Sequence, residues 1–168
     1  DNGRQWKRIG PLAGETNKGP ELMEDAEGVL WGATGPQSGE GKFRMVRSSK
    51  DGGDTWSEPT MSSMQDANTR GSLALGQDAS DQPVWYYASS GVVTDENGGI
   101  FRTHLTLFGS RDEGKSWTEL RRMHFGAWSY PTVVPLGPNR CGISFRRDSY
   151  VSNKQEIRFV VAGDLWGK

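Results

Sequence analysis

The sequence predicts an all-β fold. Its apolar residues fall in short runs separated by turns of glycine, aspartate, asparagine and serine, which is typical of short strands. No stretch has the periodicity of a long amphipathic helix. Two consecutive units, residues 19–66 and 67–124, each contain several such runs and one fixed turn. This repetition is typical of the blades of a β-propeller.

The fixed turn is the strongest repeated motif. It reads "SSKDGGDTW" at residues 48–56 and "SRDEGKSW" at residues 110–117, and a shortened copy, "DNGRQW", begins the chain. We expect Asp51 and Asp112 to accept backbone hydrogen bonds within their own turns. The second glycine of the first copy and its equivalent in the second are expected to adopt backbone conformations that other residues resist. The turn is therefore predicted to be structural and not catalytic.

The predicted strands divide the chain into four segments. Residues 1–18 are expected to form the outer strand of a preceding blade, followed by blades at 19–66, 67–124 and 125–168, of which the last ends after three strands. A propeller needs roughly four to eight blades to close its ring. We therefore expect a single incomplete propeller segment whose partner is a missing N-terminal half, carried in the same or a separate chain.

The composition excludes several classes of function. The formal net charge is −1, so no basic field indicates a nucleic-acid partner. Cys141 is the only cysteine, which excludes an internal disulfide and a cysteine-built zinc site. His104 and His124 lack the spacing of metal ligands. We expect no metal, no cofactor and no membrane span, and the residues themselves leave the localisation open.

The candidate functional residues lie where predicted strands begin near the central channel of a propeller. Glu21, Arg70 and Tyr130 each open an innermost strand, and Arg102 opens the third strand of the second blade. One carboxylate, two guanidinium groups and one phenol are therefore expected to converge on the mouth of the channel. Arg44 alternates with apolar residues on an outer strand and is expected to be structural.

The repeated turn resembles the Asp-box of the sialidase (neuraminidase) superfamily. Sialidases are six-bladed β-propellers, so the resemblance implies that this chain is the C-terminal half of a catalytic domain, and it favours a secreted or cell-surface location. In "FRTHLTLFGSRDEGKSW" it implies that Arg102 grips the carboxylate of sialic acid through two parallel hydrogen bonds. It further implies that Tyr130 is the nucleophile, since sialidases use a tyrosine in place of the usual carboxylate.

The resemblance also implies a glutamate that activates this tyrosine. The stretch "GPELMEDAEGVL" offers Glu21 or Glu24, and Glu21 is preferred because Glu24 lies deeper in the strand. One family arginine is missing, because its expected position is occupied by Thr34 or Gly35. Arg44 and Arg70 are the candidates to compensate, of which Arg70 is preferred. The family's remaining arginine and its acid/base aspartate belong to the N-terminal part of the domain.

These features lead to three hypotheses. The first is a portion of a sialidase-like glycoside hydrolase that cleaves a terminal sialic acid or another acidic sugar from glycoconjugates by a retaining mechanism. The second is a related glycosidase or lyase that acts on a different sugar, which would explain the missing arginine. The third is a non-catalytic propeller that binds carbohydrate or protein, in which exposed Trp85, Tyr86 and Trp128 would stack on sugar rings. A fold does not choose among them.

Overall fold

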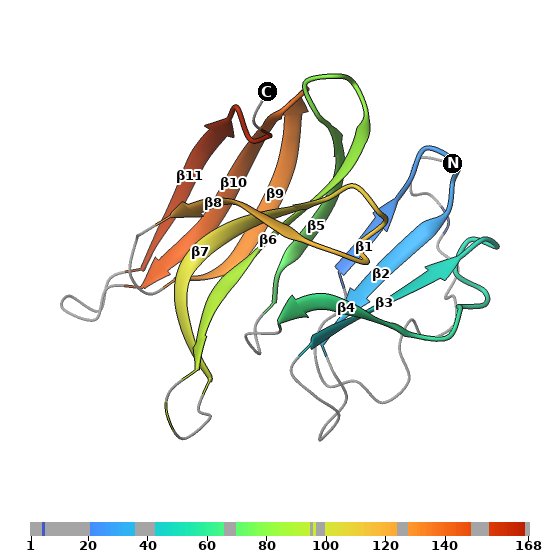
Figure 1. The fold of residues 1–168 in the computed structure, drawn as a ribbon, viewed down its shortest axis with the longest axis horizontal. Helices are drawn as coiled ribbons and strands as arrows, with labels where there is room; N and C mark the ends of the chain where they lie inside the picture. The colour runs from blue at the N-terminus through green and yellow to red at the C-terminus, as the bar shows by residue number, and fades with distance from the viewer. Residues whose placement is uncertain are drawn as a thin grey trace.

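The computed structural model describes residues 5, 21–35, 43–65, 70–94, 96, 100–123, 128–148 and 155–166. Every regular element in this part of the chain is a β-strand, and the strands form three antiparallel sheets (Figure 1). The predicted all-β fold with three blades is therefore confirmed. The outer strand expected within residues 1–18 lies outside the described residues, apart from Gln5.

Each sheet follows the order of the chain. The first contains β1 (Glu21–Glu24), β2 (Leu30–Thr34), β3 (Phe43–Ser49) and β4 (Thr60–Gln65). The second contains β5 (Ser72–Gln77), β6 (Pro83–Thr94), β7 (Ile100–Ser110) and β8 (Thr118–Met123). The third contains β9 (Trp128–Gly137), β10 (Arg140–Asp148) and β11 (Gln155–Gly163). Antiparallel neighbours joined by short turns are typical of a propeller blade.

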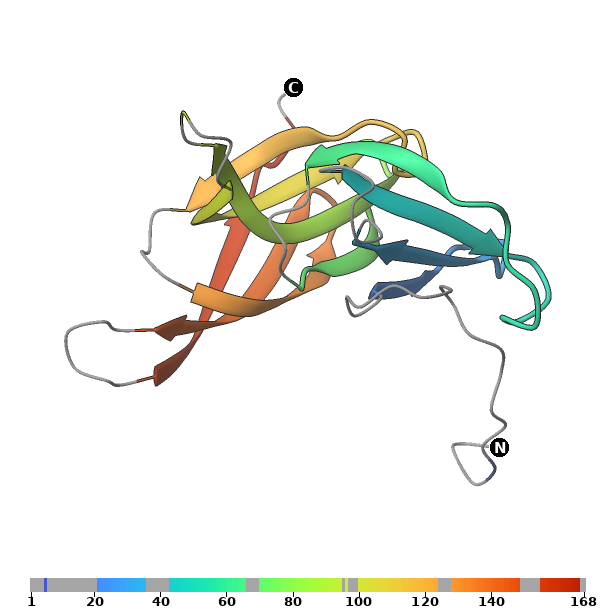
Figure 2. The same ribbon diagram turned by 90° about the horizontal axis from the view of Figure 1, so that it is seen from below.

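The first strands of the three sheets are neighbours. The second sheet lies between the other two (Figure 2), and β5 lies beside both β1 and β9. The backbone N–H of Val133 in β9 donates to Ser72 Oγ at 3.0 Å. The backbone N–H of Gly71, just before β5, donates to Glu21 Oε1 in β1 at 2.7 Å. Both bonds lie at the beginning of β5, so this point joins all three sheets.

Two apolar cores fill the spaces between adjacent sheets, and β6 contributes to both. Trp85 and Tyr87 belong to the core shared with the first sheet, whereas Val84, Tyr86 and Ala88 belong to the core shared with the third. Successive residues of a strand point to opposite faces, and both faces of this middle sheet are covered. Trp85 is 5% exposed and Tyr86 is fully buried. The prediction that they form exposed stacking platforms is therefore wrong, and the side chain of Trp128 lies outside the described part.

Both complete copies of the repeated turn contain the same hydrogen bonds. Asp51 accepts from the backbone N–H and the hydroxyl of Thr55, at 2.9 and 2.5 Å, and Asp112 accepts the equivalent pair from Ser116, at 2.9 and 2.6 Å. The bonds from Thr55 hold the pKa of Asp51 well below its ordinary value of 3.8. Gly53 has a φ of 96°, in the region that favours glycine. The structural role predicted for the turn is confirmed.

The second turn also ties its blade to the first. The backbone N–H of Trp117 donates to Ser63 Oγ in β4 at 3.2 Å, and its indole N–H donates to the Gly114 carbonyl at 2.9 Å. Its ring lies 5.7 Å from that of Tyr87, measured between centroids. The tryptophan that ends the motif therefore packs between two sheets, where burial of a large ring is most stabilising.

The two outer sheets leave apolar side chains exposed. On β11 the alternating residues Ile157, Phe159 and Val161 are 78%, 60% and 48% exposed. On the first sheet Leu22 is 54% exposed and Met61 is 62% exposed. Blades of a propeller bury such faces against the next blade. The described residues contain no helix that could cross a membrane.

Replacing Asp112 with alanine should lower the free energy of unfolding by about 1–3 kcal/mol, because two donors of Ser116 lose their acceptor. Thermal and urea denaturation measure the loss. Lys50→Ala is the matched control, since Lys50 is exposed in the first copy of the turn, and we expect a change within about 0.5 kcal/mol. An unchanged melting temperature for Asp112→Ala would contradict the structural role.

Candidate active site

Glu21 begins β1 as a buried acid. Its residue is 8% exposed, and it shares the inner face of the strand with Met23, whereas Leu22 and Glu24 are exposed on the other face. Oε2 of Glu21 accepts a hydrogen bond from Arg44 in β3 at 2.7 Å, and Oε1 accepts one from the Gly71 N–H at 2.7 Å. Each carboxylate oxygen thus has a donor, one from its own sheet and one from the second sheet. Two such donors favour the charged form of a carboxylate.

Arg44, which the sequence pattern predicted to be structural, forms a buried ion pair with Glu21. It is 2% exposed, and its guanidinium carbon lies 5.1 Å from the centroid of the Tyr87 ring. Arginine is rarely this buried without a charged partner. The signal was present in β3, because Arg44 and Val46 alternate on the buried face. A charged residue in phase with a core residue indicates an inward-facing ion pair.

Tyr130 lies on a β-bulge near the beginning of β9. Thr132 pairs with Ser144 and Ser129 pairs with Arg146, so two residues of β9 stand opposite one of β10. Tyr130 has a φ of 54°, which is rare for a bulky residue. Bulges redirect side chains, and strained backbone is concentrated at functional sites. The geometry therefore singles out Tyr130 among the residues of β9.

The phenol of Tyr130 is accessible. The residue is 55% exposed, and the guanidinium carbon of Arg146 lies 4.9 Å from the centroid of its ring. The hydrogen bonds described for Glu21 go to Arg44 and Gly71. Glu21 in β1 and Tyr130 in β9 lie on the two strands that flank β5. A direct hydrogen bond between their side chains stays a prediction.

Three other residues were predicted as candidates for the site: Arg70, Arg102 and Glu24. Arg70 is exposed and directly precedes Gly71, whose N–H binds Glu21. Arg102 lies in β7 opposite Val92, and its side chain is outside the described part. Glu24, the alternative acid, is exposed at the far end of β1. Within the described ranges no group of acids, histidines and cysteines could hold a metal ion.

Residues 1–138 match the BNR repeat-like domain. The chain belongs to the BNR repeat-like domain family. No curated protein sequence matches it.

Solved structures of glycosidases are similar to this BNR chain. An α-L-arabinofuranosidase from Fusarium graminearum matches with 17% identity and a TM-score of 0.66, over 92% of this chain and 47% of that one. The intramolecular trans-sialidase from Ruminococcus gnavus matches with 15% identity and a TM-score of 0.67, over 98% of this chain and 36% of that one. Trypanosoma rangeli sialidase matches with 16% identity and a TM-score of 0.68, over 96% of this chain and 25% of that one. The predicted likeness to part of a six-bladed sialidase propeller is confirmed as a likeness of fold.

This BNR chain spans between a quarter and a half of the length of these three solved chains: 47%, 36% and 25%. Their identities lie below the level at which an activity can be transferred. The likeness is shared between enzymes that are named for sialic acid and one that is named for arabinofuranose.

Arg44→Met should lower the free energy of unfolding by about 3–5 kcal/mol, because it leaves the Glu21 carboxylate buried without its guanidinium. The double variant Glu21→Gln with Arg44→Met should lose less than the sum of the single variants, since no charge is then left alone. Urea denaturation of the four proteins measures this coupling. Arg158→Met, which removes an exposed ion pair with Glu156, is the control and should cost at most about 1 kcal/mol. Strictly additive losses would contradict the pairing.

Proposed function

We propose that this chain supplies the C-terminal part of the active site of a sialidase-like glycoside hydrolase. The enzyme would remove a terminal sialic acid or another acidic sugar from glycoconjugates with retention of configuration. The observation that carries the proposal is Tyr130, an exposed phenol on a strained bulge near the start of an innermost strand. Fold likeness to sialidases supports it as an analogy.

Tyr130 is the nucleophile in this proposal, and Glu21 is its base. A phenol is almost entirely un-ionised at neutral pH, so it needs a neighbouring group to take its proton. Hydrogen bonds from Arg44 and Gly71 hold the Glu21 carboxylate in place at the start of β1, where it is proposed to accept that proton. Arg44 therefore acts through Glu21 and is a positioning residue.

The reaction has two steps. Tyr130 Oη attacks the anomeric carbon as its proton passes to Glu21, and the glycosidic bond breaks as an acid from the remainder of the propeller protonates the leaving oxygen. A glycosyl-tyrosine bond joins sugar and enzyme until water attacks the same carbon. The water gives its proton to the conjugate base of that same acid, the bond from the carbon to Tyr130 Oη breaks, and Glu21 returns its proton to Oη. A neutral phenol suits an acidic sugar because a carboxylate nucleophile would be repelled by the carboxylate of the sugar.

Two arginines are proposed to hold the sugar acid. A guanidinium matches a carboxylate through two parallel hydrogen bonds. Arg70 is exposed beside the residue that binds Glu21, and Arg102 is assigned through the sialidase resemblance. Arg44 is paired with Glu21 at 2.7 Å, which leaves Arg70 as the better candidate to replace the missing family arginine.

The second candidate is a glycosidase that acts on a different, uncharged sugar. Thr34 is 1% exposed at the end of β2, where the sialidase resemblance calls for an arginine. The similarity to an arabinofuranosidase is as close as the similarity to the sialidases. The non-catalytic alternative has less support, because Trp85 and Tyr86 are buried.

Tyr130→Phe in the natural full-length protein should keep the fold and most ground-state binding, since only one hydroxyl is lost. Turnover should fall by several orders of magnitude, as expected when covalent catalysis is lost. Peptide mass analysis after treatment with a 2,3-difluorinated sialic acid should find the label on Tyr130 in the wild type. Tyr86→Phe, at a fully buried tyrosine in the core shared with the third sheet, is the matched control and should remain active. A label on another residue, or an active Tyr130→Phe variant, would refute the mechanism.

Arg102→Lys should separate the two candidate substrates. If the sugar is acidic, lysine keeps the charge but loses the bidentate contact, so affinity for a carboxylated sugar should fall about tenfold or more. Isothermal titration with sialic acid and with a neutral sugar measures the difference. Unchanged affinity for sialic acid would remove Arg102 from the site and favour the second candidate.

A further inference from the structure

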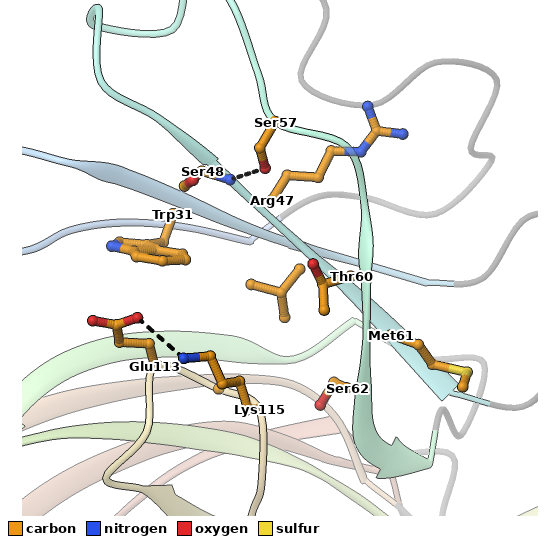
Figure 3. Close-up of a pocket in the computed structure, with 11 residues that line it drawn as sticks. Trp31, Arg47, Ser48, Ser57, Thr60, Met61, Ser62, Glu113 and Lys115 are labelled. Atoms are coloured by element: carbon orange, nitrogen blue, oxygen red, sulfur yellow. Dashed lines mark hydrogen bonds and ion pairs between the residues drawn. The ribbon is translucent and has the colours of Figure 1, made fainter.

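A cavity of about 190 Å³ lies between the first and second sheets. It is lined by Trp31 of β2, by residues at the end of β3, by Thr60 and Ser62 of β4, and by Glu113 and Lys115 of the second Asp-box turn (Figure 3). Strand β3 runs from Arg44 beside Glu21 to Ser48 in this cavity. The cavity therefore lies along the outer strands β3 and β4 of the first sheet, and no residue of β1, the innermost strand that carries Glu21, lines it.

Trp31 forms an aromatic wall whose orientation is fixed. Its indole N–H donates to Asp25 Oδ2 at 2.7 Å, and its ring lies 4.8 Å from that of Trp85, with an interplanar angle of 65°. The side chain is only half-buried, so part of the ring remains open. A sugar presents C–H groups on the face of its ring, and a rigid, partly exposed indole is a surface on which such a face can pack.

The polar groups of the cavity suit a ligand rich in hydroxyls. Thr60 and Ser62 contribute hydroxyl groups, and the Glu113 carboxylate lies 3.7 Å from the Lys115 ammonium. In Figure 3 this ion pair faces Trp31 across the cavity, whereas the guanidinium of Arg47 points away. These two exposed charges at the edge of the cavity have opposite signs, so the lining offers donors and acceptors with little net charge. Such a lining favours a neutral ligand over an anion.

We infer that this cavity is a second, non-catalytic sugar site that binds one neutral glycosyl unit. The sugar ring packs on Trp31, and its hydroxyls bond to Glu113, Lys115 and the hydroxyls of β4. All lining residues belong to the first two sheets, and Tyr130 is not among them. The inference therefore does not depend on the assignment of Tyr130 as a nucleophile. A sugar site in this cavity would retain a glycan chain and so raise the local concentration of the other sugar units of that chain.

The test is a titration of the natural full-length protein, followed through the indole N–H resonance of Trp31. Lactose and arabinobiose are the neutral probes, 3′-sialyllactose is the charged comparison, and loss of the resonance in Trp31→Phe assigns it. Both neutral sugars should shift the resonance. Lys115→Met should weaken binding about tenfold, the size expected for one lost charged hydrogen bond. Lys50→Met, the same substitution in the first Asp-box turn, should leave the affinity unchanged.

Three results would overturn the inference. The first is the absence of any shift at Trp31 with either neutral sugar. The second is equal affinity of the Lys115→Met variant and the wild type. The third is a response to 3′-sialyllactose alone, which would contradict the neutral ligand. Lys115 is exposed on a turn, so its substitution tests the site without risk to the core.

Discussion

The meeting of Gly71 with Glu21 is the contact on which the arrangement at the channel depends. A buried carboxylate is costly unless it is paired and hydrogen-bonded, and here one donor comes from each of two blades. The approach requires a glycine, because a Cβ at position 71 would lie 2.0 Å from the Tyr87 hydroxyl. Gly71, Glu21, Arg44 and Tyr87 therefore set how closely the first and second blades approach each other.

The two ends of the sheets differ in structure. At one end the Asp-box turns satisfy their own backbone groups and lock neighbouring blades together, as the bond between Trp117 and Ser63 shows. At the other end the innermost strands begin, and there Glu21 forms a buried ion pair and Tyr130 lies on a strained bulge. Strained backbone is concentrated at functional sites, and this is the end at which we propose the active site.

The fold could be predicted from local patterns, because each turn copy contains all of its own hydrogen-bonding partners. The site could be predicted only in part. The places of Glu21 and Tyr130 at strand starts were predictable and their roles remain proposals, whereas the pairing of Arg44 depends on two strands that meet only after folding. Trp85 and Tyr86 were misjudged, since their burial depends on sheets that cover β6 on both faces. The bulge at Tyr130 depends on its register with β10.

Whether Glu21 serves Tyr130 is the question on which the enzymatic interpretation rests. The most direct measurement is the separation of Tyr130 Oη from the nearer Glu21 oxygen in a crystal structure of the natural full-length protein with a bound sugar. We expect about 2.6–3.2 Å, the reach of a nucleophile and its base. A phenol that stays stacked on Arg146, with its oxygen beyond hydrogen-bonding distance of Glu21 in the sugar complex, would contradict the proposed mechanism.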